Sequence, residues 1–184
     1  MNFWIHVRKL VSCLAKENKK AHKHIEDFNP DVMSLEKSYQ DFSSKMQLFN
    51  AGSGYENFND FIVSEASEYK NTGDGVTYVV WNILYDKDNI EIDRDIVSYY
   101  TLSATAIPYE DRIRCDEEEV LETGEEFDIE ICGISALEIK MFAVNQNYQD
   151  VFFKYAGEDL PISAWIMRSI IDYAYSLLDG VIGF

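Results

Sequence analysis

Residues 134–148, which read ISALEIKMFAVNQNY, decide the fold expected for this chain of 184 residues. From residue 137 the side chains alternate between two faces, as in a β-strand. One face carries Leu137, Ile139, Met141 and Ala143, and the other carries Glu138, Lys140, Phe142 and Val144. A carboxylate in a mostly apolar strand is costly unless it is paired or functional. Glu138 is therefore either the ion-pair partner of Lys140 on a solvated sheet face or a catalytic group.

The same stretch resembles the fourth strand of the GNAT superfamily of acetyl-CoA-dependent N-acetyltransferases. In several members of that family, a glutamate at the position matching Glu138 is the general base. Backbone groups matching Phe142, Ala143 and Val144 pair with the pantetheine arm of the cofactor. The resemblance thus implies direct attack of an amine on acetyl-CoA, with Glu138 as base and a backbone N–H near residues 142–144 holding the oxyanion.

The composition is that of one ordinary folded domain. The mass is 21.3 kDa, 47% of the residues are hydrophobic, and 14% are aromatic. No uncharged apolar run approaches the roughly 18 residues that a membrane span needs, so we expect no membrane contact. The cysteines (Cys13, Cys115 and Cys132) are odd in number and lack metal-ligand spacing. These features predict a cytoplasmic protein without a metal site.

Charge is distributed unevenly along the sequence. The net charge is −17. Residues 1–24 carry six basic residues against Glu17, which gives +5 and leaves −22 for the remainder. A surface this acidic repels phosphate backbones. We therefore predict that nucleic acid is not a partner, and that the acceptor is cationic, either a small-molecule amine or a basic peptide.

Residues 1–30 are expected to form a basic helical extension that ends at Asn29-Pro30. Its apolar positions recur at helical spacing, with basic residues between and after them: Phe3, Val7, Leu10, Val11 and Leu14. Such a helix can lie on a membrane surface, dock on a partner, or pack against its own domain. We favour a packed or self-associating segment. Residues 31–184 are then the GNAT-like acyltransferase domain.

The middle of the chain reads as helices followed by a β-hairpin. The expected order is a helical region at 31–71 interrupted at 50–54, a turn at 72–75, and strands at 76–85 and 96–107, the second ended by Pro108. Residues 97–103 resemble the third GNAT strand. The hydroxyls of Thr101, Ser103 and Thr105 share one face there, and either pair across strands or act on a substrate.

Residues 109–133 are predicted to be irregular. Nine acids and no base lie between Asp116 and Glu130. Such a run is either a solvated surface loop or a specificity loop for a cationic acceptor. In the family, this connection borders the acceptor cleft.

The family follows its fourth strand with a glycine-rich turn whose N–H groups hold the cofactor pyrophosphate at a helix start. Here the stretch 150–159 has only one glycine, Gly157, and three acids, Asp150, Glu158 and Asp159. Tyr148-Gln149 matches the beginning of that turn, and we expect a rebuilt turn whose donors come from Leu160, Ile162 and Ser163, with Gln149 counted among the cofactor-binding residues. An apolar and buried helix at 161–178 follows, ended by Asp179-Gly180.

Together these patterns predict an α+β fold, a mixed but mostly antiparallel sheet flanked by helices. Residues 180–184, GVIGF, resemble the opening of the fifth GNAT strand, so the fold is expected to be incomplete at the C-terminus. An unpaired fourth strand leaves an open edge, which predicts a homo-oligomer. Two functions remain: an N-acetyltransferase that modifies a small-molecule amine or a basic peptide, and a catalytically inactive interaction or oligomerisation module on the same scaffold.

Overall fold

The computed structural model describes residues 23–114 and 127–182, so residues 1–22 of the basic helical extension expected at 1–30 lie outside the described residues. The N-terminal elements are β1 (Lys23–His24), β2 (Pro30–Ser34), α2 (Leu35–Met46), α3 (Glu56–Asp60), the π-helical turn η1 (Phe61–Glu65) and α4 (Ala66–Thr72). Then follow β3 (Val76–Tyr85), β4 (Glu91–Arg114), β5 (Phe127–Val144), the 3-10 turn η2 (Gln146–Tyr148), β6 (Val151–Tyr155), β7 (Glu158–Pro161) and α6 (Ile162–Ile182).

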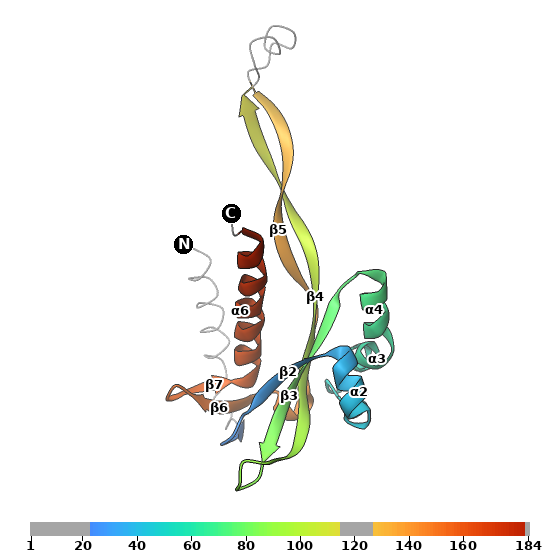
Figure 1. The fold of residues 1–184 in the computed structure, drawn as a ribbon, viewed down its shortest axis with the longest axis vertical. Coiled ribbons are helices and arrows are strands. Elements are labelled where there is room, and N and C mark those ends of the chain that lie inside the picture. The colour runs from blue at the N-terminus through green and yellow to red at the C-terminus, as the bar shows by residue number, and fades with distance from the viewer. Residues whose placement is uncertain (1–22, 115–126, 183–184) are drawn as a thin grey trace.

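Two sheets organise these elements. The larger has the order β2-β3-β4-β5 and is antiparallel throughout, and the smaller has the order β1-β6-β7, with β1 parallel to β6. Helices α2, α3 and α4 lie on one side of the larger sheet and α6 lies on the other (Figure 1). The expected α+β class, with a mostly antiparallel sheet flanked by helices, is confirmed.

Each face of the larger sheet has its own core. The first core joins the sheet to α2, η1 and α4, and its largest buried side chains are Trp81, Tyr99, Phe61, Met46 and Ile62. The second joins the sheet to β6 and α6, and includes Val80, Val97, Val151, Ile162, Ile166 and Ile170. Consecutive residues of β3, such as Val80 and Trp81, therefore enter opposite cores, as the two-residue period of a strand requires.

The prediction of an irregular segment at 109–133 is wrong for the described residues. Strands β4 and β5 pair without interruption from Leu102 and Ile139 out to Arg114 and Phe127, as a long twisted ribbon (Figure 1). Pro108 does not end β4, because the pairing of β3 with β4 stops at Leu102. Beyond that point one edge of β4 is open, and an open edge tolerates a residue without an N–H. Most of the acidic run lies outside the described residues.

Three further predictions need correction. Residues 30–34 form β2, not helix, because the short apolar pair Val32-Met33 completes the edge of the sheet beside β3. Residues 180–182 continue α6 instead of opening a fifth strand. Helix α6 is buried on one face only, and Arg168, Asp172 and Tyr175 are exposed. By contrast, the predicted strand at 76–85 is confirmed. Among the described helices, none has the length and apolarity to cross a bilayer.

Candidate active site

Glu138 lies on the exposed part of β5, opposite Ser103 of β4. Its Oε2 atom is 3.2 Å from Nζ of Lys140, and the two side chains are 50% and 38% exposed, respectively. The ion pair on a solvated face is therefore present, as one of the two interpretations of the sequence expected. This pairing does not test the role of Glu138 as a base, which stays a prediction.

A β-bulge separates Glu138 from the end of the strand. Thr101 pairs with Met141 and Leu102 pairs with Ile139, so Lys140 is the extra residue. A bulge leaves backbone groups of the extra residue unpaired and bends the strand, and bulges often occur beside active sites. The Lys140 N–H at this bulge is a candidate donor to a developing oxyanion. The hydroxyl of Thr101 is not available for a substrate, because it is buried and bonds Thr77 Oγ1 at 2.8 Å.

The end of β5 presents backbone groups to an open edge, since β5 is the last strand of its sheet among the described residues. The N–H of Asn145 donates to Val97 O of β4 at 2.8 Å. Because groups on an antiparallel strand alternate between its two sides, the N–H and C=O of Phe142 and Val144 point to the outer edge, and those of Ala143 point to β4. Of the three predicted pantetheine partners, two therefore present backbone groups at the edge.

Gln149 fixes this end of β5 to the loop between α2 and α3. Its Nε2 atom donates to Ala51 O and to Val144 O, each at 2.9 Å. Gln149 was predicted to begin the phosphate-binding turn. In the structure, its side chain instead holds the C-terminal end of β5 against the loop between α2 and α3.

Replacing Gln149 with methionine is expected to destabilise the fold by about 1–2 kcal/mol, because two carbonyls lose a partner while the volume is retained. Urea denaturation followed by circular dichroism measures this change. Gln146→Met is the matched control, because no hydrogen bond from the Gln146 side chain joins described residues. An equal effect of both variants would contradict the positioning contact.

The expected phosphate-binding turn at 150–159 is instead the β-hairpin β6-β7. Val151 and Phe153 are buried in the second core, and the loop residues Ala156 and Gly157 have φ angles of 51° and 88°. Two consecutive positive φ angles are those of a type I′ hairpin turn, which matches strand twist. The alternation of buried residues in β6, followed by the turn at Ala156-Gly157, thus produces a β-hairpin where the family resemblance predicted a phosphate-binding turn.

The remaining predicted cofactor residues lie at the junction of β7 and α6. Leu160 pairs with Phe153, Ile162 is fully buried, and Ser163 is exposed in the first turn of α6. Only Ser163 is thus open to a ligand through its side chain. The adjacent Asp159 carboxylate is paired with Lys154 at 2.7 Å and with His24 at 3.7 Å. The hydrogen bond from Lys154 holds the pKa of Asp159 below its usual value.

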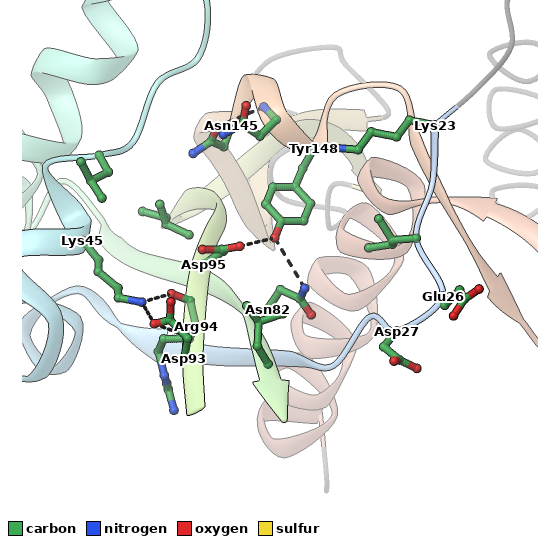
Figure 2. Close-up of a pocket in the computed structure, with 15 residues that line it drawn as sticks. Lys23, Glu26, Asp27, Lys45, Asn82, Asp93, Arg94, Asp95, Asn145 and Tyr148 are labelled. Carbon is green, nitrogen blue, oxygen red and sulfur yellow. Dashed lines mark hydrogen bonds and ion pairs between the residues drawn. The ribbon is translucent and has the colours of Figure 1, made fainter. Parts of the chain in front are cut away.

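Sequence reasoning missed a cavity of about 840 Å³ at the C-terminal end of β5. Figure 2 shows Tyr148 at its centre, between the N-terminal segment 23–27 and the start of β4. The Tyr148 hydroxyl donates to Asp95 Oδ2 at 3.1 Å and faces Nδ2 of Asn82 at 3.5 Å. None of the predicted site residues lines the cavity. Its one sequence signal is the polar run that directly follows the strand, Asn145 to Tyr148.

Burial and the nearby Asp95 carboxylate raise the pKa of Tyr148 to about 12, although the Asn82 hydrogen bond opposes the rise. The folded state then holds this proton more tightly than the unfolded state, whose tyrosines titrate near ~10. This contribution to stability is complete below about pH 10 and is lost as the pH rises toward 12. The free energy of unfolding of the natural protein exceeds that of Tyr148→Phe by a margin that we expect to shrink by about 1 kcal/mol as the pH rises through that range. This figure includes an allowance for solvent screening. Urea titrations of both proteins at pH 9 to 11 measure it, and a constant difference would contradict it.

No protein-family model and no curated protein sequence matches the chain. Several solved structures share a distant similarity of shape with it. One is a tyrosine-to-phenylalanine mutant of the toxin AtaT bound to the C-terminus of the antitoxin AtaR and acetyl-CoA, with 14% identity, a TM-score of 0.48, and coverage of 86% of this chain and 72% of that chain. Another is a mutant of KacT, with 12% identity, a TM-score of 0.47, and coverage of 84% and 74%.

A third similar structure corrects the prediction about partners. It is AtaT complexed with acetyl-methionyl-tRNAfMet, with 14% identity, a TM-score of 0.40, and coverage of 82% and 73%. This complex, and that of AtaT with the antitoxin AtaR, contradict the expectation of a small-molecule amine or basic peptide as partner and the exclusion of nucleic acid. The expectation rested on net charge, which is a sum over the whole chain. A local surface can still bind RNA when the sum is negative.

Proposed function

We propose that this chain is an N-acetyltransferase that uses acetyl-CoA, with Glu138 as the general base. The single observation that carries the proposal is the geometry of β5. One strand brings together an exposed carboxylate, a bulge at Lys140, and an open edge at Phe142 and Val144. Resemblance to the fourth GNAT strand predicts the carboxylate at Glu138 and the backbone groups near residues 142–144, whereas the bulge comes from the structure.

The bound acetyl-CoA supplies an acetyl thioester, and the chain supplies its position and the proton transfer. The outward N–H and C=O of Phe142 and the outward N–H of Val144 align the pantetheine arm as an added strand would be aligned, while the Val144 C=O is held by Gln149. Ser163 and the first turn of α6 are the donors available for the phosphates. Pairing of the Asp159 carboxylate with Lys154 lowers the electrostatic cost of placing phosphates there.

Glu138 then removes a proton from the acceptor amine, directly or through a water, and the amine attacks the thioester carbon. The Lys140 N–H at the bulge would stabilise the oxyanion, and coenzyme A would leave as its thiolate. Lys140 must first release the Glu138 carboxylate. Because this ion pair is exposed, its separation costs only about 0–1 kcal/mol, which is small beside a catalytic barrier.

One observation favours a second function, an interaction module without catalysis. The hairpin β6-β7 stands where the family has its phosphate-binding turn. Loss of that turn removes donors on which the affinity of the family for its cofactor depends. The two functions differ in one measurable property, which is the binding of acetyl-CoA.

Calorimetric titration of the full chain with acetyl-CoA, and with coenzyme A as a second ligand, tests the proposal. We expect micromolar binding. Val144→Pro removes the outward N–H at the sheet edge, where proline is tolerated, and should weaken binding at least about tenfold. Val144→Ala keeps the N–H and should bind like the natural protein. Absence of binding up to millimolar acetyl-CoA would favour the interaction module.

The acceptor is the next unknown once binding is established. We propose charged tRNA as the first acceptor to test, since it is the class of molecule in the AtaT complex. Transfer is measured as coenzyme A released in the presence of aminoacyl-tRNA. Release that requires the aminoacyl group, and not the tRNA alone, would support attack by its amine.

A further inference from the structure

Helix α6 has two apolar faces and only one of them is covered. Ile162, Ile166 and Ile170 are buried against the larger sheet. On the opposite side of the helix, Ala164, Met167, Ile171 and Tyr175 follow one another at helical spacing. Neither core includes any of these four residues. We call them the outer stripe of α6.

The outer stripe is open to solvent at its far end. The Tyr175 side chain is 42% exposed, and Met167 and Ile171 are partly exposed. A helix that is apolar on two opposite sides is normally buried on both. Because none of the four stripe residues belongs to either core of the described residues, the stripe is a candidate docking surface.

The chain enters the described structure beside the start of α6. Lys23 pairs with Val151 of β6, and Val151 belongs to the same core as Ile162 and Ile166 of α6. Phe28 then packs against Trp165 of α6, with ring centroids 5.4 Å apart. The described part of the chain therefore begins close to the N-terminal end of this helix.

The preceding segment fits the stripe in pattern and length. Its apolar positions recur at helical spacing, with basic residues on the other side. A helix over residues 3–22 would be about 30 Å long, and the 21 residues of α6 span about 31 Å.

We propose that the outer stripe of α6 is the docking surface for residues 1–22 of the same chain. The segment lies antiparallel to α6, because its C-terminal end is held at the start of that helix by β1. Leu14 and Leu10 then contact the region of Ile171 and Tyr175. This inference does not depend on the proposed enzymatic function.

Hydrogen exchange of the full chain, followed by mass spectrometry at two protein concentrations tenfold apart, tests the inference. An isolated helix of this length is marginal in water, so slow exchange of its amides reports docking. We expect residues 3–20 to exchange at least about tenfold more slowly than an unstructured peptide. The protection should be equal at both concentrations.

Two pairs of variants locate the contact. Leu10→Asp and Ile171→Asp should each abolish the protection, whereas Ser12→Asp and Ser176→Asp, which lie off the two stripes, should retain it. Exchange of β3 and β4 amides in the same spectra shows that the domain is still folded. The inference is overturned if the segment is unprotected in the natural chain, or if protection survives Ile171→Asp in a folded domain. Protection that grows with concentration would also overturn it, because it would place the segment on a second copy.

Discussion

Replacement of Glu138 by glutamine is expected to lower the rate of acetyl transfer by about 100- to 10,000-fold, the usual contribution of a general base. Glutamine keeps the size of the side chain and removes its ability to take a proton. The measurement is the steady-state release of coenzyme A with aminoacyl-tRNA as acceptor. The affinity for acetyl-CoA should not change, because the cofactor is held by backbone groups of Phe142 and Val144 in the proposed site.

Two further variants separate the role of a base from that of an ion-pair partner. Lys140→Ala breaks the same ion pair but leaves the carboxylate, so its rate should stay within a few-fold of the natural protein. Glu130→Gln removes another exposed carboxylate of β5 and should have no effect. Equal losses in Glu138→Gln and Lys140→Ala would show that the pair only supports the strand. A rate unchanged in Glu138→Gln would remove Glu138 from the mechanism.

Much of the fold is predictable where local pattern and burial agree. The strand at 76–85 alternates between two cores, and both of its ends are marked by turns, so its bounds are the ones observed. Helix α6 begins within one residue of its predicted start, next to Pro161. Its extension past Gly180 was missed, because glycine is tolerated in a helix when nothing else ends it.

The missed elements depend on contacts between distant segments. The outer ribbon of β4 and β5 has many charged residues, and only the pairing of Asp111 with Glu130 and its neighbours shows that they face each other across two strands. Short β2 is a strand because β3 lies beside it. These pairings are long-range, and local periodicity does not report them.

The candidate site shows the same division. Its strand, its carboxylate and the Glu138–Lys140 pair follow from the alternation of residues 137–144. The bulge at Lys140 and the outward direction of Phe142 and Val144 depend on register with β4, which sequence alone does not fix. The cavity around Tyr148 combines residues from segments as far apart as Lys23 and Asn147, so no single stretch indicates it.

Replacement of Trp81 by alanine is expected to have the largest effect on stability, a loss of about 3–5 kcal/mol. Trp81 is fully buried in the first core, and its ring centroid is 5.2 Å from that of Phe42. Its Nε1 atom donates to Ser38 Oγ at 3.2 Å, and Ser38 is itself fully buried. The variant therefore creates a cavity and also removes the partner of a buried hydroxyl.

Thermal unfolding by calorimetry and urea denaturation measure this loss. For a domain of this size, 3–5 kcal/mol corresponds to a fall in Tm of roughly 6–20 °C. Trp81→Phe is the matched control, because it keeps one aromatic ring in the core while it removes the indole N–H and part of the volume, so it should lose about half as much or less. A loss below about 1 kcal/mol in Trp81→Ala would mean that α2 does not pack on β3 as described. Because α2 and the β5 edge both depend on the same sheet, such a result would also undermine the geometry on which the proposed site rests.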